Sequence, residues 1–115
     1  MKVSIKRVYA QPATADGYRI LVDRLWPRGM KKEEAHVDNW AKDIAPSAEL
    51  RKWFNHDVEK WVSFGEKYKS ELQDTAAWTA FVEEVKKHAT ITLLFAAKDE
   101  AHNNAVILRE LLRDQ

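Results

Sequence analysis

Hydrophobic and polar positions follow two patterns along the chain, one typical of strands and one of helices. Residues 3–9 alternate as in a half-buried strand. Residues 18–26 are rich in β-branched and aromatic side chains and residues 91–97 are continuously apolar, which indicates strands covered on both faces in a parallel sheet. Residues 11–17 form a turn-rich loop. The segment 37–45 fits either a short strand or an irregular run.

Between the strands, apolar side chains recur every three or four residues, which predicts helices. Ser47, Asp57 and Thr75 each precede such a segment and are suited as N-caps. A last helix is predicted after residues 91–97, with Asp99 as its N-cap. Its inward-facing residues are Ala101, Ala105, Leu108 and Leu112.

Strands that alternate with helices predict a single α/β domain over residues 1–115. We expect a small three-layer sandwich in which a short, mostly parallel sheet is flanked by helices. A chain of 115 residues suits one hydrophobic core, and five tryptophans provide large side chains to fill it.

Composition excludes several classes of protein. The chain has no cysteine, which excludes disulfide frameworks, thiolate metal sites and cysteine nucleophiles. It shows neither a signal peptide nor the ~18 apolar residues of a membrane span, so we expect a cytoplasmic protein without a membrane partner. The four histidines do not have the spacing of a metal site. The chain also lacks the glycine-rich loops that bind nucleotide cofactors and the GxSxG motif of esterases. We therefore expect no cofactor.

Charge is unevenly distributed. Residues 1–32 carry eight Lys or Arg against two Asp, a net charge of +6, and residues 33–115 carry eleven against sixteen, a net charge of −5. A basic first third is compatible with phosphate ligands or nucleic acid. The alternative is charge pairing between the two parts of the chain on one folded surface, which the absence of any run of five basic residues favours.

The sequence DRLWPRG, residues 23–29, follows a predicted buried strand, and ligands of open α/β sheets bind beyond the carboxyl ends of the strands. Pro27 is expected to end that strand. Arg24 and Arg28 then offer planar, paired donors for phosphate or carboxylate, with Trp26 as a stacking wall. A structural alternative gives Trp26 to the core and pairs Arg24 with a nearby acid, either Asp43 or Asp99.

A second loop, KDEAHNN at 98–104, follows the other buried strand. Lys98 beside a helix N-terminus favours an anion. His102 is a candidate general acid or base, and Asp99 a weaker candidate proton carrier; alternatively, His102 is a surface residue of the first helical turn. Asn103 is a candidate ligand contact, or it hydrogen bonds only to the backbone.

Two more candidates lie between these loops. The Ser47 hydroxyl either caps its helix or contacts a ligand at the same N-terminus. Arg51 lies one turn further on and is expected to join Arg24 and Arg28.

The blocks DGYRILVDRLWPRG, WAKDIAPSAELRKWF and FAAKDEAHNNAVILRELL resemble the DUF488 family of small bacterial proteins, in its YeaO-like branch. The likeness covers essentially the whole chain. It implies an α/β domain and no settled activity, cofactor or catalytic residue. Many members read HNHA where this chain reads HNNA, so Asn104 stands in place of a histidine. The signature carried over comprises Asp23, Arg24, Trp26, Pro27, Arg28, Gly29, Lys42, Pro46, Ser47, Leu50, Arg51, Lys98 and Asn103, and Lys42 becomes a candidate ligand contact on this ground.

Two functional hypotheses follow. In the first, the protein binds or acts on a small phosphorylated or nucleotide-like anion, held by Arg24, Arg28, Arg51 and Lys98. In the second, it is a nucleic-acid-binding or regulatory partner-binding module that uses the basic first third of the chain. A purely structural alternative is that the charged cluster only braces the loops.

Overall fold

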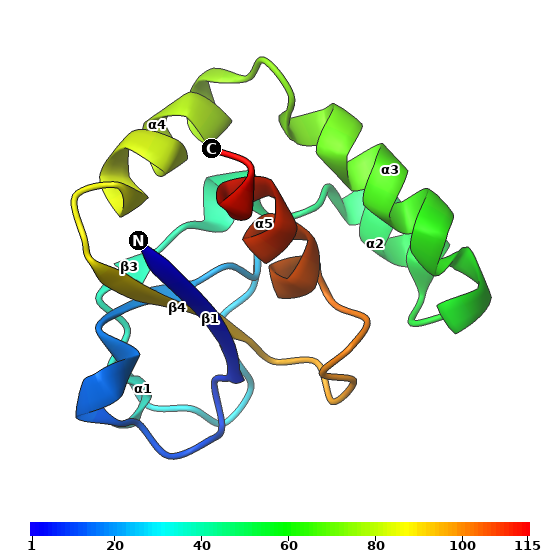
Figure 1. Ribbon diagram of the computed structural model, residues 1–115. Coiled ribbons are helices and arrows are strands. Elements are labelled where there is room, and N and C mark those ends of the chain that lie inside the picture. Colours follow the sequence, from blue (N-terminus) through cyan, green and yellow to red (C-terminus); the bar gives the residue numbers. More distant parts are fainter.

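The computed structural model describes residues 1–115, which form one four-stranded sheet and five α-helices (Figure 1). The strands are β1 (Lys2–Arg7), β2 (Tyr18–Leu21), β3 (Asn39–Trp40) and β4 (Thr90–Phe95). The helices are α1 (Lys32–Ala35), α2 (Ala48–Phe54), α3 (Trp61–Leu72), α4 (Ala76–Val85) and α5 (Asn104–Arg113). The predicted α/β fold is confirmed.

All neighbouring strands are parallel, in the order β1-β4-β2-β3. The strand β4 lies between β1 and β2, so that Ile91 pairs with Val3 on one side and with Tyr18 on the other. Because the strands run in one direction, the loops after β1, β2 and β4 leave the sheet at the same edge. This arrangement brings together the two loops that the sequence singled out.

The two faces of the sheet are covered unequally. One face packs against α2, α3, α4 and α5 in a core cluster of 18 buried residues, and Figure 1 shows α5 lying directly against the sheet with α2 and α3 to its side. The other face is covered by the single turn of α1 and by loops. Its core is a cluster of four buried residues, Val8, Leu21, Ala35 and Leu94.

The predicted caps begin their helices. The Ser47 hydroxyl accepts the Leu50 N–H at 3.1 Å, and the Thr75 hydroxyl accepts the Trp78 N–H at 3.1 Å. Asp57 caps a short 3-10 turn that leads directly into α3. The longest helix, α3, has 12 residues, and no helix combines the length and apolar character needed to cross a bilayer.

The predicted strand at 18–26 is too long. It ends at Leu21, and only the Val22 N–H still bonds across to the Leu94 carbonyl, at 3.1 Å. The reason is Asp23, whose carboxylate accepts the Ala96 N–H at 2.9 Å and so occupies a donor that a longer β2 would have used. The strand therefore ends before Pro27 acts on it, and Arg24 and Arg28 lie in a loop instead of at a strand end.

The start of the last helix was also predicted wrongly. Asn103, not Asp99, is the N-cap of α5: its side chain accepts the Val106 N–H at 3.3 Å and donates to the Asp99 carbonyl at 2.9 Å. Asp99 instead closes a preceding turn by accepting the N–H groups of Ala101 and His102. His102 therefore precedes the helix, and Ala101 is exposed. The other predicted inward-facing residues, Ala105, Leu108 and Leu112, are buried.

The remaining boundaries agree with the sequence to within a few residues. β1 and β4 fall on the predicted strands at 3–9 and 91–97. The ambiguous segment 37–45 contains both alternatives, the two-residue strand β3 and a 3-10 turn at Lys42–Ile44.

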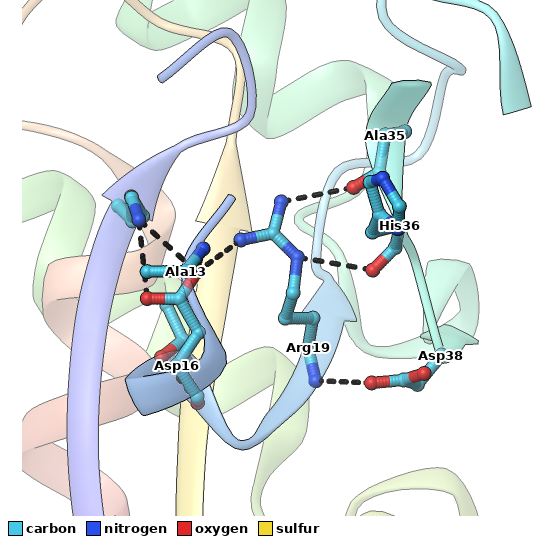
Figure 2. A network of polar contacts seen from close by, with 8 residues as sticks. Ala13, Asp16, Arg19, Ala35, His36 and Asp38 are labelled. Carbon is cyan, nitrogen blue, oxygen red and sulfur yellow. Dashed lines mark hydrogen bonds and ion pairs between the residues drawn. The ribbon is translucent and has the colours of Figure 1, made fainter. Parts of the chain in front are cut away.

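At the start of β2, Arg19 is the only buried charged side chain of the protein, with 4% of its surface exposed. Figure 2 shows its guanidinium between the Asp16 carboxylate on one side and the carbonyl groups of Ala35 and His36 on the other, at 2.9 Å and 3.0 Å. Lys6 also pairs with Asp16, at 3.0 Å. This network ties β1 and β2 to the end of α1.

Candidate functional site

A cavity of about 600 Å³ opens at the carboxyl edge of the sheet. Its walls are the segments that follow β1, β2 and β4, together with α2 and the residues just after it. The polar side chains lining it include Asp23, Arg24, Arg28, Arg51, His102 and Asn104. Its size is that of pockets for small organic ligands, and its place is where α/β sheets bind them.

The structure brings six of the sequence-predicted site residues to this cavity and leaves four outside its lining. Those lining it are Arg24, Trp26, Arg28, Arg51, His102 and Asn103. Of the others, Lys42 lies over the Trp40 ring at 4.9 Å, and Ser47 caps α2 and hydrogen bonds to Glu71. Lys98 is exposed on the neighbouring loop, and Asp99 contacts the cavity only through His102.

The three arginines have no carboxylate partner. Arg28 and Arg51 are exposed, and their guanidinium groups make no hydrogen bond within the protein. Arg24 is half-buried and donates two long hydrogen bonds of 3.4 Å, both to backbone carbonyl groups. The predicted alternative in which Arg24 pairs with Asp43 or Asp99 is wrong, because no such ion pair forms. Three guanidinium groups thus line one cavity together with Lys52, and none of the three arginines forms an ion pair within the protein.

Trp26 fixes one wall of the cavity. Its indole N–H donates to the Met30 carbonyl at 2.7 Å, and its ring meets Trp40 edge-on at 5.4 Å. It also packs against the small core cluster. Trp26 therefore packs on the core, as the structural alternative predicted, and it also lines the cavity, while its stacking on a ligand stays a prediction.

Asp23 is the only carboxylate that lines the cavity. The sequence analysis placed it in the family signature but did not make it a candidate site residue. Its position is fixed twice, because its side chain accepts the Ala96 N–H and its backbone carbonyl accepts the Trp40 indole N–H at 2.8 Å. Burial raises its pKa, and the Ala96 N–H, the Asn104 side chain and the Arg51 charge only partly oppose that effect. The available signal was an acid placed directly after a buried strand.

His102 and Asp99, predicted separately, form a pair. The His102 Nδ1 lies 2.9 Å from an Asp99 carboxylate oxygen, and this hydrogen bond is the main reason that the pKa of Asp99 is lowered. An ionised carboxylate only accepts, so Nδ1 carries the hydrogen. In the neutral ring Nε2 is then an acceptor, and it has no partner within the protein. The ring itself meets Trp61 edge-on at 5.2 Å.

Sequence reasoning also missed several neighbours of these groups. Tyr9, which follows β1, donates to the Arg28 carbonyl at 2.8 Å, and this hydrogen bond holds the loop at residues 23–29 in place. Asn104 lines the cavity, and its side chain donates to the Val22 carbonyl at 2.8 Å. The cavity lining also includes Phe54, Asn55, His56 and Phe64. These residues come from segments far apart in sequence, whose meeting depends on the fold.

The sequence is similar to proteins that span almost its whole length. It is 43% identical over 113 residues to the uncharacterized protein YeaO of Escherichia coli, with 98% of each chain covered. It is 39% identical over 111 residues to the uncharacterized proteins Rv3073c of Mycobacterium tuberculosis and Mb3100c of Mycobacterium bovis, covering 96% of this chain and 93% of theirs. No solved structure matches it significantly. Residues 2–115 match a family model described as "Inactive DUF488-N3 subclade", and the chain therefore belongs to the DUF488 family.

Proposed function

We propose that the cavity binds a small phosphorylated or nucleotide-like anion through Arg24, Arg28 and Arg51. One observation carries this proposal: three guanidinium groups from two separate segments line the same cavity, and none has a carboxylate partner. Paired donors of this kind suit a phosphate, since guanidinium groups form short, charge-assisted hydrogen bonds with its oxygens. Trp26 supplies an apolar wall beside them, and Asn103, the N-cap of α5, also lines the cavity.

Two observations favour binding over turnover. The matching family model is described as an inactive subclade. In addition, Asn104 lines the cavity beside His102, and an amide does not transfer protons at neutral pH. His102, with Asp99 behind it, stays the side chain best suited to carry a proton should a reaction occur.

The basic first third of the chain gives less support to a nucleic-acid surface than its composition suggested. Lys6 and Arg19 pair with Asp16, and Arg7 donates to the carbonyl groups of Ala96 and Ala97 at 3.0 Å and 2.9 Å. With Arg24, which donates to the carbonyl groups of Ala45 and Pro46, four of the eight basic side chains of residues 1–32 are therefore engaged inside the protein. A small anion in the cavity is the function that the geometry supports best.

The test is a thermal-shift titration with inorganic phosphate and with adenosine monophosphate. We expect either to stabilise the parent protein, by about 2.7 kcal/mol when the ligand is at a hundred times its Kd. Arg28→Ala and Arg51→Ala should each weaken binding about ten-fold without unfolding the exposed sites. Arg113→Ala removes an exposed arginine far from the cavity and is the matched control.

Salt separates the pocket from a nucleic-acid surface. Binding of one small anion should weaken only moderately between 50 and 200 mM salt, whereas a protein that contacts many backbone phosphates loses about a thousand-fold or more. Equal losses in Arg28→Ala and Arg113→Ala, or no stabilisation of the parent, would refute the proposal.

A further inference from the structure

The cavity holds hydrogen-bond acceptors as well as arginines, and from this we infer that its ligand is a phosphorylated polyol, such as a sugar phosphate, whose hydroxyl groups hydrogen bond to Asp23 and His102. The inference rests on the proposed function and adds the part of the ligand that is not the phosphate.

The first acceptor is the Asp23 carboxylate. Within the protein it accepts the Ala96 N–H, at 2.9 Å, the Asn104 amide lies close enough to lower its pKa, and it forms no ion pair with any of the three arginines. The Arg51 charge acts on it only from a distance, beyond ion-pair range. A ligand that was anionic throughout would be repelled by this carboxylate, whereas a hydroxyl group would donate to it. The Asp23 carboxylate thus favours a ligand with a neutral part that donates hydrogen bonds.

The second acceptor is the Nε2 atom of His102. Asp99 holds the other ring nitrogen, so the neutral ring presents a lone pair at Nε2. The histidine side chain is 30% exposed and lines the cavity. Two acceptors from different loops, Asp23 after β2 and His102 before α5, thus line one cavity. A ligand with several hydroxyl groups can donate hydrogen bonds to both acceptors.

Size and position agree with this assignment. Arg28 and Arg51 are the exposed part of the cavity lining, whereas Asp23 is half-buried and Phe54 and Phe64 are buried. A phosphate alone would not fill about 600 Å³. A phosphate at the rim with a hydroxylated body pointing inward would use the arginines, the acceptors and the apolar wall.

The decisive comparison uses glycerol 3-phosphate and propyl phosphate, two esters with the same carbon skeleton and charge that differ only in two hydroxyl groups. Calorimetric titration of the parent protein should show glycerol 3-phosphate binding about ten-fold more tightly, the effect of one hydrogen bond to a charged acceptor. Asp23→Asn keeps an acceptor for the Ala96 N–H but loses the charge, and it should reduce the preference to about three-fold or less. Asp43→Asn makes the same change outside the cavity and should keep the full preference.

The outcomes separate this inference from the function on which it rests. If both esters bind the parent equally, the polyol inference is wrong and the anion site stands. If neither ester nor inorganic phosphate binds, both fall. The comparison of the two esters in the parent protein needs no variant. His102→Gln tests the second acceptor in the same way as Asp23→Asn tests the first. A full preference for glycerol 3-phosphate in both variants would overturn the assignment. Ribose 5-phosphate and adenosine monophosphate then distinguish a free sugar phosphate from a nucleotide, and tighter binding of either than of propyl phosphate supports the inference.

Discussion

Replacing Arg19 by methionine should destabilise the protein more than any other single change at a charged residue. The guanidinium has three protein partners, the Asp16 carboxylate and the carbonyl groups of Ala35 and His36, and its side chain is only 5% exposed. Removing one member of a buried ion pair costs about 3–5 kcal/mol. Because Lys6 still neutralises Asp16, we expect the lower end, about 3 kcal/mol. That is a large part of the total for a domain of this size, roughly 5–15 kcal/mol.

Urea denaturation followed by circular dichroism measures the loss directly, and thermal unfolding should show a fall of roughly 10–15 °C. Lys32→Met, at an exposed site, is the matched control and should change stability by less than about 0.5 kcal/mol. A loss below about 1 kcal/mol for Arg19→Met would show that water replaces the guanidinium at little cost, and that the network in Figure 2 does not hold β2 to α1.

Three further predictions concern stability. Burial acts to raise the pKa of Asp16, but hydrogen bonds from Ala13, Lys6 and Arg19 lower this pKa overall. The ionised Asp16 therefore contributes its full stability above about pH 4, and that contribution is lost as the pH falls through the lowered pKa. Urea titrations down to pH 2 should show a smaller loss of stability in Arg19→Met than in the parent. The raised pKa of Asp23 has the opposite effect, because the ionised carboxylate costs stability at neutral pH. Asp23→Asn should therefore unfold at a higher urea concentration than the parent at pH 7, and the difference should shrink towards pH 4. A variant less stable than the parent at pH 7 would contradict this. Gly17→Ala should cost more than about 2 kcal/mol, because φ is +66° and a Cβ would overlap the Thr90 carbonyl oxygen. Gly29→Ala, at φ +76° with open space around it, should cost only about 1–2 kcal/mol, and similar losses of both variants by thermal unfolding would show that the contact with Thr90 relaxes freely.

Local signals predicted much of the fold. The caps at Ser47 and Thr75 depend on a hydroxyl next to an apolar repeat, and both interactions are contained within four residues of sequence. The end of β2 depends on a contact across 73 positions, between Asp23 and Ala96, and no local pattern contains it. The start of α5 was predicted wrongly for a different reason: Asp99 and Asn103 are both good cap residues, and the local sequence does not distinguish between them.

The candidate site shows the same division. Arginines in a loop after a buried strand are visible in the sequence, and Arg24, Arg28 and Arg51 do line one cavity. Lys42 was predicted to contact a ligand from the family signature, and Ser47 from its position at a helix N-terminus. In the structure, Lys42 lies over the Trp40 ring and Ser47 hydrogen bonds to Glu71. Side-chain direction is set by neighbours that are distant in sequence, so a list of signature residues predicts the region of a site better than its lining.

The strand order also determines when the sheet can form during synthesis. β4, the strand that hydrogen bonds to both β1 and β2, is the last to leave the ribosome. Until residues 90–95 emerge, β1 has no partner in the sheet, and β2 can pair only with the two residues of β3. The nascent chain must therefore carry exposed apolar strands through most of translation and then close contacts of long sequence separation, a feature associated with slow folding. A fragment ending before residue 90 would lack the centre of its sheet, and with it the edge on which the cavity is built.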